Sequence, residues 1–254
     1  DYGVNKLHSG VSGMTWLPFT TNDGLANNKV TRIDEAPNGD LWFSHSSFSA
    51  GVSVFDGNNW ISYNSPDLPI SGVCATSFSD NGDIWFASPL DGLAHYDGTN
   101  FTNYSSNDGL LSNYSTSILV DNSNNIWLGS QDGMTVMNST INQFTFHTIM
   151  YSLPPPDTLN PVTEIAKDSW GRIWTTIYVG YLAEGGVAYW NGSQWFDFDH
   201  SDGIAGPNVK SLAIDSQNNV WIATTTGVSK ISAIPSNFQQ IKTHSYHIYP
   251  NPSS

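Results

Sequence analysis

The chain has 254 residues and a formal net charge of −14, with 8 Lys and Arg against 22 Asp and Glu. Such an acidic composition argues against a nucleic-acid partner or an anionic membrane surface, where Lys and Arg must neutralise phosphate. No apolar stretch is long enough to span a bilayer, so we also expect no membrane insertion. Charged residues are only 12% and aromatic residues 13%, which is typical of stacked β-sheets.

In chain order, the first predicted element is half of a β-sheet unit. Residues 3–16 begin with Gly-Val, continue as a strand and a turn, and end on an aromatic residue. The second half of each later unit has the same pattern. We therefore expect a half unit over residues 1–20, whose first half is missing.

Five longer units follow, and each contains an aliphatic residue followed by Trp. The pairs are Leu41-Trp42, Ile84-Trp85, Ile126-Trp127, Ile173-Trp174 and Val220-Trp221. A strand begins near the position twelve residues before each Trp. The residue three before each Trp is always Gly or Asn, which suits a turn with positive φ. This spacing predicts two strands joined by a tight hairpin.

The rest of each unit predicts two further strands. The second strand is a continuous apolar run, which indicates burial on both faces. The third strand opens with Gly, and the fourth opens with an aromatic residue, the last being Phe238. Four short strands at this period predict an all-β fold, a β-propeller of four-stranded antiparallel blades. We expect blades at about 30–64, 73–105, 115–148, 162–199 and 209–242, as part of a propeller of six to eight blades or more.

Asp23-Gly24-Leu25 and Asp108-Gly109-Leu110 precede first strands, and Asp202-Gly203-Ile204 is a close variant of the same motif. Together with the aliphatic-Trp hairpin that follows, this repeat resembles the two-component-regulator propeller repeat, whose pattern includes Asp-Gly-Leu ahead of the first strand. The resemblance implies a propeller that binds ligands as sensor propellers do. Family members that are membrane sensors continue into a transmembrane helix and a kinase, and the tail of this chain departs from that pattern.

That tail, residues 243–254, lies beyond the propeller repeats of residues 1–242. Its segment Ile248-Tyr249-Pro250-Asn251-Pro252-Ser253 resembles the opening of the C-terminal sorting domain of the type IX secretion system of Bacteroidota. The resemblance implies an exported protein, secreted or held at the cell surface, with the type IX secretion machinery as a partner.

Loop lengths predict where a ligand would bind. The hairpins between first and second strands are constant, whereas the loops on the opposite rim vary, and variable loops on a rigid scaffold are common binding sites. Blade four has two long insertions there, at 147–161 and 175–186. We expect a glycan or peptide ligand, and the candidate residues are His45, Phe48, Asp91, Asp132, Tyr151, Tyr178, Tyr181 and Glu184. Alternatively, these loops only cap the rim.

Two other classes of function remain open. One is a propeller enzyme resembling streptogramin or polysaccharide lyases, which would use a divalent metal with His45, Asp91, Asp132 or Glu184. The other is a structural or adhesion scaffold. The seven His residues are scattered, so we expect no metal ligands and no cofactor, and we favour binding over catalysis.

Three recurrent aspartates and one isolated cysteine receive structural interpretations. Asp121, Asp168 and Asp215 each precede a Trp by six residues, and we expect them to accept backbone N–H bonds in the hairpins. Although Asp121 also begins a segment similar to a calcium-binding loop, we interpret this segment as a turn. Cys74 is the sole cysteine and is expected to be a small buried residue.

Overall fold

The computed structural model describes residues 3–10, 13–47, 50–140, 142–151, 160–178 and 185–232. The chain divides into two compact units, Asp1–Ile118 and Leu119–Ser254. The boundary between them falls inside strand β11 (Ser115–Val120). Apart from the 3-10 turn η2 (His200–Asp202), the elements discussed below are all β-strands.

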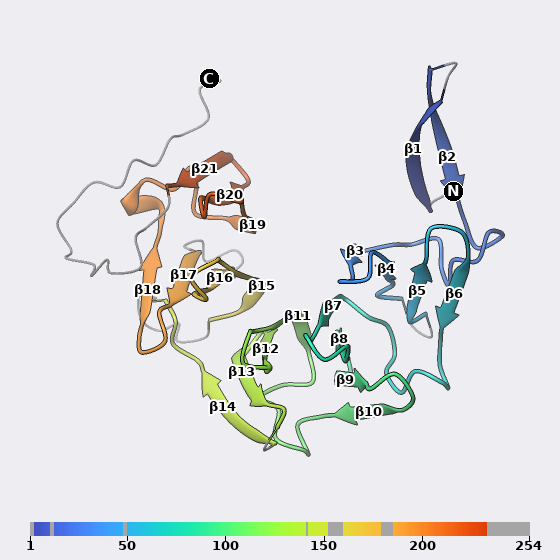
Figure 1. Ribbon diagram of the computed structural model, residues 1–254. Coiled ribbons are helices and arrows are strands. Elements are labelled where there is room, and N and C mark those ends of the chain that lie inside the picture. Colours follow the sequence, from blue (N-terminus) through green and yellow to red (C-terminus); the bar gives the residue numbers. More distant parts are fainter. Residues whose placement is uncertain are drawn as a thin grey trace. The chain divides into compact units, whose positions relative to one another are not determined.

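The first unit contains a two-stranded hairpin and two complete four-stranded blades (Figure 1). The hairpin consists of β1 (Val4–Gly10) and β2 (Gly13–Phe19) and lies within residues 1–20, where a half unit is expected. Blade one consists of β3 (Arg32–Glu35), β4 (Leu41–Ser44), β5 (Val52–Phe55) and β6 (Trp60–Tyr63). Blade two consists of β7 (Ala75–Phe78), β8 (Ile84–Ser88), β9 (Gly92–Tyr96) and β10 (Phe101–Tyr104).

The second unit continues the same pattern. Blade three adds β12 (Asn125–Ser130), β13 (Gly133–Asn138) and β14 (Gln143–His147) to β11. Blade four consists of β15 (Val162–Lys167), β16 (Ile173–Ile177), β17 (Gly186–Trp190) and β18 (Trp195–Phe198). Blade five has β19 (Val209–Ile214), β20 (Val220–Thr224) and β21 (Gly227–Ile231), and its predicted fourth strand, led by Phe238, lies outside the described residues. The prediction of an all-β propeller with four-stranded antiparallel blades is confirmed.

The hairpin between the first two strands of each blade turns where the sequence predicts. The position three residues before each Trp has a positive φ in all five blades: Gly39 (88°), Gly82 (94°), Asn124 (57°), Gly171 (82°) and Asn218 (61°). Gly and Asn tolerate this left-handed backbone better than other residues do. The turn chemistry therefore fixes the register of the two inner strands.

Each unit has its core between neighbouring sheets, and the repeated Trp lies at that interface. In the first unit, Trp42 of blade one packs in one cluster with Val73 and Phe86 of blade two. In the second unit, Trp174 of blade four packs likewise with Val209 of blade five. Burying a Trp side chain stabilises the fold by roughly 4–6 kcal/mol, so this position is a principal source of blade stacking.

Trp221 of blade five differs from the other four, because 41% of its surface is exposed. Trp42, Trp127 and Trp174 each pack in one cluster with residues of the sheet that follows them, whereas no sheet follows β21 in the described part of the chain. The burial that the apolar run of the second strand predicts therefore holds for the Trp residues of blades one to four and not for Trp221, within the described residues.

The Asp-Gly-Leu segments tie one blade to the next. The carboxylate of Asp23 accepts the Thr20 backbone N–H at 2.8 Å, and Asp108 does the same for Ser105. Gly24 has a φ of 124° and lies so close to Trp60 that an added Cβ would be 2.5 Å from the Trp60 Cβ. The apolar residue that follows is buried in all three copies, at Leu25, Leu110 and Ile204. The motif thus has a structural role.

Candidate functional site

The hairpin rim of the blades contains a repeated hydrogen bond between a Trp side chain and the residue six before it. The indole N–H of Trp127 donates to Asp121 at 2.9 Å, and the indole N–H of Trp174 donates to Asp168 at 3.0 Å. Trp221 donates to Asp215 in the same way. Each of these carboxylates also accepts backbone N–H groups of its hairpin, as predicted. The indole bond was missed, although the constant six-residue spacing could have revealed it.

These hydrogen bonds shift the acidity of the hairpin carboxyls. Burial alone would raise the pKa of Asp121, but hydrogen bonds from Trp127 and Asn125 outweigh it and lower that pKa. Hydrogen bonds from the Trp221 indole and from Asn219 hold the pKa of Asp215 well below its usual range. Both groups are therefore carboxylates at neutral pH, and they act as fixed acceptors.

Blade four adds a buried ion pair to this arrangement. The Arg172 Nε lies 2.5 Å from the Asp168 Oδ2, and both side chains are buried. The Arg172 guanidinium also lies over aromatic rings, at 4.6 Å from the Trp170 centroid and 5.2 Å from that of Tyr189. This cluster holds the blade-four hairpin against its own sheet and leaves Asp168 committed to structure.

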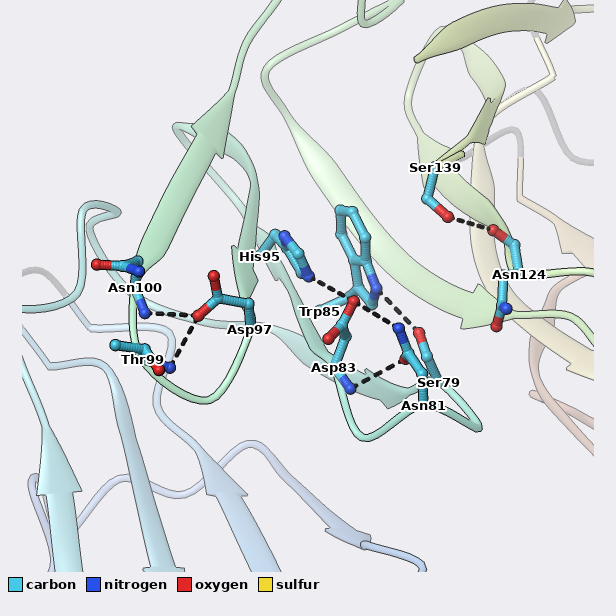
Figure 2. Close-up of polar contacts among 10 residues, drawn as sticks. All are labelled: Ser79, Asn81, Asp83, Trp85, His95, Asp97, Thr99, Asn100, Asn124 and Ser139. Carbon is cyan, nitrogen blue, oxygen red and sulfur yellow. Dashed lines mark hydrogen bonds and ion pairs between the residues drawn. The ribbon is translucent and has the colours of Figure 1, made fainter. Parts of the chain in front are cut away.

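Blade two has Ser79 where three other blades have Asp, and Figure 2 shows the result. The Trp85 indole donates to the Ser79 hydroxyl at 3.1 Å. The His95 ring stacks on Trp85 with centroids 4.1 Å apart, and its Nε2 lies 3.0 Å from the Asp83 carboxylate. The hairpin rim of blade two is therefore also organised around its Trp.

His45 and Asp91, the described candidates of blades one and two, lie inside the turns of the variable rim. His45 has no exposed surface, and its ring nitrogens lie 3.1 Å from the Lys29 carbonyl and 2.9 Å from the Ser53 hydroxyl. Burial lowers the pKa of His45 despite the opposing bond from Lys29. Asp91 accepts the Ser71 backbone N–H. These contacts give both side chains a role in holding the loops.

Two candidates of the second unit lie in similar structural positions. Asp132 is in the turn between β12 and β13, where its backbone N–H donates to the Ser130 hydroxyl. Tyr151 is buried, and its hydroxyl donates to Asp199 at 3.1 Å. The Tyr151 ring fills the space beside Gly186, where an added Cβ would lie 2.8 Å from it. Tyr151 thus packs under the rim.

Tyr178 has a different environment, because a lysine of the next blade lies against its ring. Tyr178 follows the end of β16, and its backbone N–H donates to the Pro161 carbonyl. The Lys210 Nζ is 4.1 Å from the centroid of the Tyr178 ring. Lys210 is exposed and Tyr178 is half-buried, so the pair presents an ammonium group beside an aromatic surface.

A β-bulge places Lys210 there. The pairing of β19 with β20 shifts between Val209 and Ser211, so Lys210 is the extra residue of the bulge. Blade four has the same shift between Val162 and Glu164, and the bulged Thr163 bonds to Thr176 through their hydroxyls, 2.7 Å apart. Bulges often redirect a side chain near functional sites. Sequence reasoning missed Lys210, because a register shift has no clear residue signature.

Three of the candidates, Phe48, Tyr181 and Glu184, lie outside the described residues. His45 and Asp91 belong to the first unit, and Asp132, Tyr151 and Tyr178 belong to the second. Within the described ranges, no group of three His, Cys, Asp or Glu side chains is arranged to hold a metal ion. The same residues contain no helix long and apolar enough to cross a bilayer.

Comparison with known proteins supports the fold. Two segments, residues 109–132 and 203–226, match the family profile of the two component regulator propeller. Each segment runs from the Gly of an Asp-Gly-aliphatic motif through the Trp hairpin, which is the part of the repeat described above. A comparison with curated proteins finds no match.

Several solved structures are similar to this chain. One is the extracellular domain of a protein described as a hybrid two component system of B. thetaiotaomicron, with a TM-score of 0.72 and 16% identity over 100% of this chain and 34% of that one. Another is PorZ, a surface component of the type-IX secretion system of Porphyromonas gingivalis, with a TM-score of 0.66 and 16% identity over 87% of this chain and 35% of that one. This chain thus spans about a third of each.

A third similar structure is virginiamycin B lyase from Staphylococcus aureus. Its TM-score is 0.68 and its identity 16%, over 98% of this chain and 78% of that one. At these identities the three likenesses show a shared propeller fold. The first two solved structures come from proteins at the cell exterior: one is an extracellular domain and the other is a surface component.

Proposed function

We propose that this propeller is a ligand-binding module of an exported protein and that it recognises a glycan or peptide on the variable rim of blade four. The observation that carries the proposal is the Lys210 ammonium, 4.1 Å from the centroid of the Tyr178 ring. An aromatic surface beside a hydrogen-bond donor suits sugars and peptides, which offer apolar faces together with hydroxyl or carbonyl acceptors.

The charge of the chain makes this pair distinctive. The protein carries −14 net charge, yet among the described residues no carboxylate forms an ion pair with Lys210. Its ammonium is therefore available to a ligand acceptor while the Tyr178 ring holds it in place, an interaction worth about 0.5–1 kcal/mol at an exposed site. The likeness to extracellular propeller domains supports a recognition role.

The direct test is a glycan array and a peptidoglycan pull-down with the full chain and two variants. In Tyr178→Ala the aromatic surface is lost, and we expect at least a tenfold loss of binding. Lys230→Met is the matched control, because Lys230 lies over Trp221 at 5.3 Å, away from Tyr178. Equal binding by wild type and Tyr178→Ala, or absence of any ligand for the folded wild type, would contradict the proposal.

We further propose export through the type IX secretion system. The segment 248–253, which lies outside the described residues, supports this by its resemblance to the start of a C-terminal sorting domain. In a bacterium with this system, the protein should reach the surface or the medium. Deleting residues 248–254 from the natural full-length protein should retain it in the periplasm, and unchanged release would overturn the idea.

A further inference from the structure

The hairpin rim of the first unit contains a cavity, on the face opposite the variable loops. It has a volume of about 320 Å³ and lies between the hairpins of blades one and two. Its walls include Pro37, Trp42, Phe78 and Ile84 as apolar surface, with Asn38, Asp40, Ser79 and Asp80 as polar groups. This volume is at the lower end of the range for small-molecule sites.

The cavity exists where the repeated indole hydrogen bond is missing. The residue six before Trp is Ser79 in blade two and Asp in blades three to five, and each accepts the indole N–H. In blade one this position is Ala36, which also lines the cavity. A methyl group can neither accept the hydrogen bond nor fill the volume of a carboxylate.

The hairpin of blade one is otherwise built like the others. The Ala36 backbone N–H donates to the Asp40 carbonyl at 2.8 Å, and the Gly39 N–H donates to the Ala36 carbonyl at 2.8 Å. The corresponding bonds in blade two join Ser79 to Asp83 and Gly82 to Ser79. Because the turns and the strand register match, Trp42 has the same position relative to Ala36 as Trp85 has relative to Ser79, and Ala36 and Trp42 both line the cavity.

Trp42 is thus a buried side chain with an unused donor. Only 6% of its surface is exposed, and among the described residues its indole N–H has no hydrogen-bond acceptor. The indole nitrogen is not one of the fully buried unpaired atoms of the described residues, so it keeps some contact with solvent, and Trp42 lines the cavity. A ligand acceptor at this point would form a hydrogen bond worth about 0.5–1.5 kcal/mol, so the cavity favours a molecule with an acceptor at its apolar end.

The charge around the cavity selects the kind of acceptor. Asp40 and Asp80 line it, and no Lys or Arg is among its described lining residues. A carboxylate or phosphate would be repelled there, whereas a neutral carbonyl would not. The two carboxylates can in turn accept hydrogen bonds from hydroxyl groups at the open side.

We propose that this cavity binds the acetamido group of an N-acetylated amino sugar. The amide carbonyl accepts the Trp42 indole N–H, the acetyl methyl lies beside Ala36 and Phe78, and ring hydroxyls donate to Asp40 and Asp80. This site is separate from the blade-four rim, and either can exist without the other.

Indole N–H signals in ¹H–¹⁵N NMR spectra of the full chain test the proposal, with Trp42→Phe assigning the Trp42 signal. N-acetylglucosamine and N-methylacetamide should shift that signal in a saturable way, whereas glucose should not. Ala36→Asp supplies the acceptor that three other blades have, so it should fold and weaken the response at least tenfold. No shift in the wild type, an equal shift with glucose, or an undiminished response in Ala36→Asp would overturn the proposal.

A second variant tests whether an unpaired indole N–H responds to the ligand when no cavity surrounds it. Asp215→Ala removes the acceptor of Trp221, whose ring is already exposed, without building walls around it. We expect the Trp221 indole of this variant to show no saturable shift with N-acetylglucosamine. A response equal to that of Trp42 would mean that any unpaired indole suffices and that the cavity has no specific role.

Discussion

At the scale of single residues, the position six before each Trp determines how each hairpin is held. Ala, Ser and Asp occupy it in different blades, and the acceptor strength rises in that order. With Asp168 the position also neutralises Arg172 inside the protein. This position of the repeat therefore contributes a different amount to the free energy of unfolding in different blades.

Removing the strongest acceptor should be costly. Asp168→Ala leaves the Arg172 guanidinium buried without its partner, and we expect a loss of about 3–5 kcal/mol in the free energy of unfolding. Ser79→Ala removes only a neutral hydrogen bond and should cost about 1 kcal/mol. Urea unfolding at neutral pH measures both values. Similar costs for the two variants would show that the ion pair does not dominate blade four.

Cys74 gives a second prediction for a single residue. Its Sγ lies 3.3 Å from the carbonyl oxygens of both Ala87 and Ser115. The residue as a whole is half-buried and not, as expected, fully buried, but burial of the thiol group still raises its pKa to about 12. Because the thiolate is the reactive form, we expect iodoacetamide at pH 8 to modify the native protein very slowly and the urea-unfolded protein quickly. Equal rates in both states would contradict this burial.

At the scale of elements, the loop before the first strand of blade one depends on a glycine, Gly24, that has no room for a side chain. Gly24→Ala would combine positive φ with a clash against Trp60. Gly57→Ala is a matched control, since Gly57 has a φ of 98° but no atom within 4 Å of an added Cβ. Backbone strain costs about 1–3 kcal/mol, so both variants should be destabilised, Gly24→Ala more. Equal thermal shifts would refute the close contact.

The elements also show what the sequence could and could not predict. The hairpins followed from Gly or Asn three residues before each Trp, because the residue type sets the backbone conformation locally. The Tyr178–Lys210 contact could not be predicted, because it joins two blades through a bulge. The burial of His45 and Tyr151 likewise depends on partners far away in sequence, Lys29 and Asp199.

At the scale of the whole molecule, a buried histidine, His45, and a half-buried one, His147, make stability depend on pH. Burial lowers the pKa of His45, against an opposing hydrogen bond from Lys29, and burial also lowers the pKa of His147. The unfolded chain therefore binds more protons than the folded one just below the ordinary histidine pKa of about 6.5. The neutral rings of His45 and His147 stabilise the fold above about pH 6.5, and this contribution is lost as the pH falls through their lowered pKa values in the folded protein.

Thermal unfolding at pH 7.5 and pH 5.5 should show this dependence. We expect a lower melting temperature at pH 5.5, and a smaller difference between the two pH values in His45→Gln. A melting temperature that stays constant or rises toward pH 5.5 would show that neither ring is held in its neutral form.

Hydrogen–deuterium exchange with the strongest glycan or peptide from the array would test ligand recognition on the blade-four rim most directly. A ligand there should slow backbone exchange in residues 160–178 and 203–210, which surround Tyr178 and Lys210. Exchange at the hairpin of residues 36–40 should change only if the ligand carries an acetamido group. Unchanged exchange in both rim segments, at a ligand concentration that saturates the protein, would contradict recognition at this rim.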